Sequence, residues 1–86
     1  MLQILLFYDV QEDRLRNKII EICRDYGLDR EQYSVFLGTL SSRQLRLLGR
    51  ELHHIIDSHS YVMIVPVGSS EWKKRIEIGV PLHVHG

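Results

Sequence analysis

The chain has 86 residues, and its eleven basic and eleven acidic side chains cancel in net charge. A domain of this size buries only about 60% of the surface that its unfolded chain exposes, so its core is marginal and a second copy would stabilise it. The balance of charge excludes an overall positive field, so attraction to nucleic acid must come from local clusters of basic residues.

The first third of the chain predicts a strand followed by a helix. Leu2–Tyr8 is a short and nearly continuous apolar run, which is typical of a central strand covered on both faces or by a partner. From Glu12 to Tyr26, apolar residues recur at helical spacing and acidic residues suit the positive start of a helix. Gly27 suits the C-terminal cap of that helix.

The middle of the chain predicts a second strand region and a second helix. Gln32–Leu37 is rich in aromatic and β-branched residues, which indicates a strand that ends near Gly38 and is either bent around Ser34 or divided in two. Ser41 and Gln44 have the spacing of a capping box. Apolar residues then recur along one side of an amphipathic helix: Leu45, Leu48, Leu52, Ile55 and Ile56.

Two strands are predicted in the last third of the chain. Tyr61–Val67 is the first, and Pro66 places it at a sheet edge or strand end because proline has no N–H to donate to a ladder. Residues 68–70 supply a turn. Alternation from Ile76 to Val80 predicts a short final strand, which Pro81 helps to end.

This order of elements predicts an α+β fold, a ferredoxin-like α/β sandwich in which two helices cover one face of a mainly antiparallel sheet of four to five strands. We expect one domain over residues 1–80 and a C-terminal tail over residues 81–86. The uncovered face needs solvent or a partner, and apolar residues are more abundant than one face requires. We therefore expect a symmetric face-to-face homodimer, with apolar bulk from Phe7, Tyr33, Val35 and Phe36.

Cysteine content and the N-terminal sequence predict a cytoplasmic protein. Cys23 is the single cysteine, which excludes an internal disulfide and is compatible with a reducing compartment. We expect this thiol to be buried and inert. The N-terminal run has no basic leader and is far shorter than the roughly 20 apolar residues of a membrane-spanning helix, so we expect no association with a membrane.

Asp9 is the strongest candidate for a functional residue. It follows the first strand directly, and carboxylates at strand ends often belong to functional sites. The alternative is a turn residue or a helix cap, because the helix begins three residues later. One carboxylate does not make a metal site, but a twofold axis would bring two copies together, and Mg²⁺ is commonly held by one or two carboxylates with water and phosphate. Such a site would support phosphodiester hydrolysis.

Two groups of basic residues are candidates for contact with phosphate. Each group has an alternative interpretation as an ordinary solvated helix face whose charges pair with neighbouring acids. The first group lies in the first helix and the second forms a stripe along the second helix, close to His53 and His54. The groups are Arg14, Arg16 and Lys18, and Arg43, Arg46 and Arg50.

Aromatic and histidine side chains give weaker signals. Tyr33 and Phe36 would suit stacking on bases, but aromatic residues in strands more often pack in a core or an interface. His83 and His85 have a spacing compatible with metal binding, without cysteine or acidic partners, so we interpret them as part of the tail.

Three stretches of the sequence resemble the CRISPR-associated Cas2 family. They are Phe7–Val10, Arg14–Lys18 and Gly27–Gly38, of which Gln32–Phe36 is the most specific. The resemblance continues through the leucines of the second helix and Ile64–Pro66 to Arg75–Gly79, so it spans essentially the whole chain.

The resemblance implies a ferredoxin-like homodimer that is a metal-dependent endonuclease on RNA or DNA. It also implies membership of the complex that captures CRISPR spacers, together with an integrase subunit. Asp9 would bind Mg²⁺ or another divalent cation such as Mn²⁺, and Lys18 stands where an arginine is often found. The final strand of the family reaches across the dimer. Positions linked to activity in the family correspond to Tyr8, Asp9, Arg16, Lys18, Arg30 and Phe36.

Two hypotheses follow from the sequence. The first is a CRISPR-associated endoribonuclease, also active on double-stranded DNA, in which paired Asp9 carboxylates hold the cation and basic residues neutralise phosphate. The alternative is a non-catalytic structural dimer that bridges the CRISPR integrase and positions DNA along its basic stripes, with Asp9 as a turn or interface residue.

Overall fold

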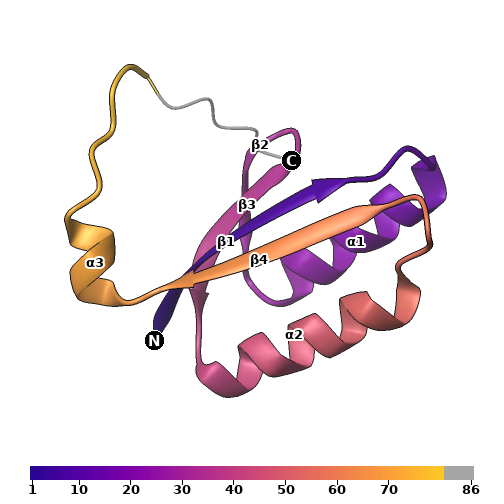
Figure 1. Cartoon of the computed structure of the whole chain (residues 1–86), viewed down its shortest axis with the longest axis horizontal. Helices are drawn as coiled ribbons and strands as arrows, with labels where there is room; N and C mark the ends of the chain where they lie inside the picture. Colours follow the sequence, from indigo (N-terminus) through magenta and orange to yellow (C-terminus); the bar gives the residue numbers. More distant parts are fainter. Residues whose placement is uncertain (81–86) are drawn as a thin grey trace.

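The computed structural model of the chain describes residues 1–80. Four strands form one antiparallel sheet in the order β2-β3-β1-β4, and helices α1 and α2 lie side by side against it (Figure 1). This is the ferredoxin-like arrangement, so the predicted fold class is confirmed. The elements are β1 (Leu2–Asp9), α1 (Asp13–Asp25), β2 (Asp29–Gln32), β3 (Val35–Leu40), α2 (Ser42–Ile55), β4 (Tyr61–Val67) and α3 (Ser69–Lys73).

Strand β1 is apolar on both sides, but the helices cover only one of them. Successive side chains of a strand point to opposite faces. Ile4, Leu6 and Tyr8 are buried in the core with residues of α1 and α2, whereas Leu5 and Phe7 point to the other face and are half-buried. The buried core consists of Ile4, Leu6, Tyr8, Val10, Ile19, Ile22, Cys23, Leu28, Phe36, Leu40, Leu48 and Leu52.

The second face of the sheet, which we call the open face, is defined by the register of the central strands. Phe7 lies opposite Val35 in β3 and Met63 in β4, and Leu5 lies opposite Leu37 and Val65. Directly opposite residues share a face of the sheet. Neither α1 nor α2 covers this open face, which carries a continuous set of apolar side chains: Leu5, Phe7, Val35, Leu37, Met63 and Val65.

Both helices begin with side-chain caps. The Glu12 carboxylate accepts hydrogen bonds from the backbone N–H groups of Arg14 and Leu15, at 3.1 and 2.7 Å. The predicted capping box of α2 is confirmed, because Ser41 Oγ accepts from Gln44 N at 3.1 Å while Gln44 Oε1 accepts from Ser41 N at 2.9 Å. These caps satisfy backbone donors that the first turn of a helix leaves unpaired.

The second strand region is a hairpin of two strands. Tyr33 and Ser34 form the turn between β2 and β3, so of the two predicted alternatives a single bent strand over Gln32–Leu37 is wrong, and β3 continues past Gly38 to Leu40. Strand β2 reads Asp-Arg-Glu-Gln and gives no apolar signal. It lies at the edge of the sheet, where polar side chains are tolerated because one side meets solvent.

The C-terminal part differs most from the prediction. The predicted turn at 68–70 opens a short helix instead, α3, and Ile76–Val80 is not a strand. A strand needs a hydrogen-bonding neighbour, and α3 leads the chain away from the free edge of β4 (Figure 1). The apolar side chains of Ile76, Ile78 and Val80 are 85, 93 and 95% exposed. The predicted tail and its histidines lie outside the described residues.

Gly38 tests the close packing of β3 on the core. A Cβ at Gly38 would lie 2.6 Å from Leu28 Cδ2 and 3.2 Å from Leu28 Cα, so backbone as well as side chain would have to move. We expect Gly38→Ala to lower the free energy of unfolding by about 1–3 kcal/mol in urea denaturation. Gly49→Ala is the matched control. Gly49 lies within α2, and apart from its own helical backbone and chain neighbours nothing lies within 4 Å of its would-be Cβ, so this change should stabilise by about 0.5–1 kcal/mol. Equal effects of both substitutions would contradict this account of the packing.

Candidate functional site

Asp9 is the last residue of β1 and its side chain is exposed. In the register of β1 and β4 it lies opposite Tyr61, and it continues the series of Leu5 and Phe7 on the open face. Glu12 caps α1, so the carboxylate of Asp9 is not used as the helix cap. Among residues 1–80 it has no hydrogen-bond or ion-pair partner, which leaves its oxygens available to a ligand.

Tyr8 fastens the end of β1 to the β2–β3 turn. Its backbone N–H donates to Ser34 O at 3.1 Å, and its hydroxyl donates to Tyr33 O. The Tyr8 side chain points into the core, and its ring lies 6.1 Å from the ring of Phe36 at an angle of 36°. Phe36 is fully buried, so it contributes to the site only by packing against the ring of Tyr8 in the core.

Arg30 reaches the same turn from β2. Its Nη2 donates to Tyr33 O at 2.9 Å, so this carbonyl accepts hydrogen bonds from two side chains. The guanidinium carbon also lies 5.7 Å from the centre of the Tyr33 ring, within the range of a cation–π interaction. Together, Tyr8 and Arg30 hold the turn against the end of β1.

Arg16 holds the segment that follows Asp9. From the first turns of α1, its Nη1 donates to Val10 O at 3.2 Å and to Gln11 O at 3.4 Å, and its Nη2 forms an ion pair with Asp13. The loop between β1 and α1 is therefore tied to the helix by hydrogen bonds from the Arg16 side chain to main-chain carbonyls of the loop.

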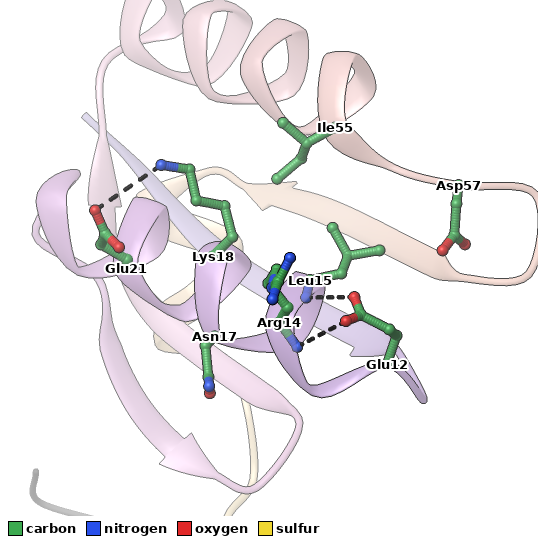
Figure 2. A pocket seen from close by; sticks show the side chains of 8 residues that line it. All are labelled: Glu12, Arg14, Leu15, Asn17, Lys18, Glu21, Ile55 and Asp57. Atoms are coloured by element: carbon green, nitrogen blue, oxygen red, sulfur yellow. Dashed lines mark hydrogen bonds and ion pairs between the residues drawn. The ribbon is translucent and has the colours of Figure 1, made fainter.

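Arg14 and Lys18 lie in a different place. Both line a groove of about 530 Å³ between the start of α1 and the end of α2, together with Ile55 and Asp57 (Figure 2). Lys18 Nζ is 4.0 Å from Glu21 Oε1. The groove lies among the helices, whereas Asp9 faces away from them, so the structure does not bring Lys18 or Arg14 together with Asp9.

The predicted basic stripe is present on α2. Arg43, Arg46 and Arg50 are exposed, and within residues 1–80 none of their side chains has a hydrogen bond or an ion pair. The first turn of α2 contains no acidic residue, so Arg43 faces the positive end of the helix dipole uncompensated. This stripe is a locally positive surface on a chain without net charge.

The remaining features concern metals, thiols and membranes. In the described part of the chain, no three His, Cys, Asp or Glu side chains lie close enough to hold a metal ion. Cys23 is buried as predicted, and burial raises the pKa of its thiol to about 12. Across residues 1–80 no helix is both long and apolar enough to cross a membrane.

Comparison with known proteins identifies the family. Residues 1–75 match the family model described as CRISPR associated protein Cas2. The chain belongs to the Cas2 family. The CRISPR-associated endoribonuclease Cas2 of Korarchaeum cryptofilum is 44% identical over 79 residues, which cover 91% of this chain and 85% of that relative. The CRISPR-associated endoribonuclease Cas2 2 of Chloroflexus aurantiacus is 37% identical over 75 residues, covering 86% and 88%.

Solved structures agree with this assignment to Cas2. A hypothetical protein from Thermus thermophilus superposes with a TM-score of 0.77 at 28% identity, covering 93% of both chains. Cas2 from Streptococcus pyogenes superposes with a TM-score of 0.73 at 25% identity, covering 91% of this chain and 99% of that one. The resemblance drawn from the sequence is thereby confirmed, and the ferredoxin-like fold is that of other Cas2 chains.

The geometry divides the residues that the Cas2 resemblance links to activity. Five of these residues lie at the end of the sheet where β1 meets the β2–β3 turn: Tyr8, Asp9, Arg16, Arg30 and Phe36. The sixth, Lys18, lies in the groove between α1 and α2. Sequence reasoning missed the carbonyl of Tyr33, where the side chains of Tyr8 and Arg30 meet. No residue pattern marks it, because a main-chain acceptor is present at every position.

Proposed function

We propose that this Cas2 chain is a cytoplasmic, metal-dependent endoribonuclease, with double-stranded DNA as a second substrate, in which Asp9 binds the cation. The observation that carries the proposal is the unpartnered Asp9 carboxylate at the rim of the open face, between two chain segments that are fastened in place. The similar proteins named CRISPR-associated endoribonucleases support cleavage of RNA.

A single Asp9 offers too few ligands for a metal centre, and the proposed dimer supplies the second. A twofold axis through paired open faces would bring two Asp9 carboxylates toward each other. Mg²⁺ or Mn²⁺ is typically bound by one or two carboxylates, with water and substrate phosphate in the other positions. The oxygen donors present therefore fit a hard divalent cation. When bound, it would supply Lewis-acid activation of the phosphoryl group and of water.

The other residues would act by position. Tyr8, Arg16 and Arg30 donate hydrogen bonds to main-chain carbonyls on both sides of Asp9, so they orient the carboxylate rather than contact the reacting phosphate. Arg14 and Lys18 face a groove on the other side of the sheet. We assign to these two an electrostatic contact with the nucleic-acid backbone away from the cleavage point.

The open face supports a homodimer. Its apolar side chains form one continuous surface without a helix to cover it, and Met63 is 41% exposed. The segment Ile76–Val80 supports exchange of a strand between copies, because its apolar side chains are exposed and the edge of β4 is free. Pairing this segment with β4 of the second copy would satisfy the backbone groups of both.

Substitution of Asp9 tests the proposed metal ligand. Asp9→Asn keeps the size of the side chain and removes its charge, so we expect RNA cleavage in Mg²⁺ to fall by more than about 100-fold. Asp25→Asn, an exposed carboxylate at the end of α1, should cleave like the unmodified protein. Cleavage by the unmodified protein should also stop with a chelator and return with added Mg²⁺. If purified Asp9→Asn protein cleaves at the full rate, Asp9 does not bind the catalytic metal.

Disruption of the open face tests the dimer. Phe7→Asp places a charge in the apolar interface, where its burial without a partner is costly, so we expect a monomer in sedimentation equilibrium. Cleavage should fall as well, because each site needs both copies of Asp9. Leu47→Asp is the matched control, since Leu47 is 40% exposed on α2, and it should remain dimeric and active. A monomeric Phe7→Asp variant with full activity would refute the two-chain site.

The alternative function, a structural dimer that positions DNA for an integrase subunit, is favoured by one observation. The three arginines of the α2 stripe have no acidic partner within residues 1–80, so their charge is available to a phosphate backbone. On this hypothesis Asp9→Asn would leave spacer capture intact while abolishing cleavage.

The α2 stripe can be tested by the salt dependence of DNA binding. Replacing Arg43, Arg46 and Arg50 together by Gln should weaken binding and reduce the slope of log K against log salt by about 2 to 3, because each phosphate contact contributes about 0.9. Replacing Arg24, Lys73 and Lys74 by Gln removes the same charge elsewhere and should change the slope less. Equal slopes in both triple variants would show that the stripe makes no specific contact.

A further inference from the structure

Tyr33 presents its ring to solvent at the tip of the β2–β3 turn. Its residue is 72% exposed, whereas Phe36, the other aromatic residue of this hairpin, is fully buried. Aromatic rings are usually buried because their large apolar area is costly to hydrate. Two-residue turns are also commonly built from glycine, asparagine or aspartate. Tyr33 therefore has no role in packing the core.

The base of the Tyr33 ring is held rigidly. Two side chains donate hydrogen bonds to the Tyr33 carbonyl, the hydroxyl of Tyr8 and Nη2 of Arg30, and the neighbouring Ser34 carbonyl accepts from the backbone of Tyr8 at 3.1 Å. These bonds fix the backbone that carries the ring, so less conformational entropy is lost there when a ligand binds. The turn is thus preorganised for contact.

Arg30 adds a positive charge to this ring. Its guanidinium carbon lies 5.7 Å from the centre of the Tyr33 ring. Aromatic rings with a neighbouring guanidinium are well suited to unpaired bases, because every base has a π-face for stacking and arginine adds a cation–π contribution. We call the ring of Tyr33 and the guanidinium of Arg30 the turn platform.

The turn platform lies at the same end of the sheet as Asp9, and its Arg30 lies off the proposed dimer interface. Arg30 is opposite Phe36 in the sheet, and the Phe36 side chain points to the helix-covered side. Association of two open faces would therefore leave Arg30 uncovered. Its link to the candidate site is direct, because Tyr8, which fastens the turn, precedes Asp9 in the chain.

We propose that the turn platform stacks on one unpaired base of the RNA that is cleaved at Asp9. This inference rests on the proposed nuclease function and specifies how the protein holds its RNA substrate. The hydroxyl of Tyr33 has no part in it, so phenylalanine should replace tyrosine without loss.

Binding of a fluorescent single-stranded RNA oligonucleotide, measured by anisotropy with excess chelator to prevent cleavage, tests the platform. Tyr33→Leu removes the π-face but keeps the carbonyl that holds the turn, and it should weaken binding about tenfold or more. Tyr33→Phe should bind like the unmodified protein. The salt dependence should be the same in all three, because no phosphate contact is lost. Equal melting temperatures would establish that the Leu variant is folded.

Oligonucleotides with a single abasic site locate the stacked base. The unmodified protein should lose affinity at one position, and Tyr33→Leu should show no further loss there. Fully paired RNA should bind the unmodified protein and Tyr33→Leu equally. The proposal is overturned if Tyr33→Leu binds single-stranded RNA as tightly as the unmodified protein does. It is also overturned if the substitution weakens binding of duplex RNA as much as binding of single-stranded RNA. If Asp9→Asn cleaves normally but the abasic pattern persists, the assignment of Asp9 fails and the platform stands.

Discussion

The alternation of side chains along β1 is the constraint on which the rest of the structure depends. Both sides of this central strand are apolar, but residues 1–80 form only two long helices, and both lie on the same face. The side with Ile4 and Leu6 forms the core. The side with Leu5 and Phe7 is left without cover, and the same period of two places Asp9 at its rim. The alternation of side chains along β1 thus determines the core, the surface proposed to bind a second copy, and the face to which the Asp9 carboxylate points.

Most of the residues that the Cas2 resemblance links to activity contribute to the shape of the site. Tyr8 and Arg30 share the carbonyl of Tyr33, and Arg16 holds the loop after Asp9. Substitution of any of these would displace the carboxylate without touching the phosphate, so a loss of activity would not by itself identify a chemical role. Lys18 belongs to the groove between the helices, so its proposed role is contact with the nucleic-acid backbone and not the shape of the site.

The sequence predicted those parts of the fold that have a periodic apolar signal. Leu2–Tyr8, the two long helices and Tyr61–Val67 are all confirmed, including the edge position indicated by Pro66. Strand β2 was missed because all four of its residues are polar, and α3 because five residues give no period. Asp9 could be found because a carboxylate after a buried strand is visible in the sequence. The hydrogen bonds that hold the segments around Asp9 could not be predicted. They depend on which main-chain carbonyls the fold brings within reach of Tyr8, Arg16 and Arg30.

The burial of Cys23 has a practical consequence. This thiol is the only one in the chain, is fully buried between α1 and the sheet, and has a pKa raised to about 12 by its surroundings. The folded protein therefore presents almost no thiolate to an oxidant or an alkylating reagent at neutral pH. Any labelling at this position reports an opening of the core itself. The rate at which the Cys23 thiol is labelled would thus measure local unfolding of the core, and this measurement needs neither nucleic acid nor metal.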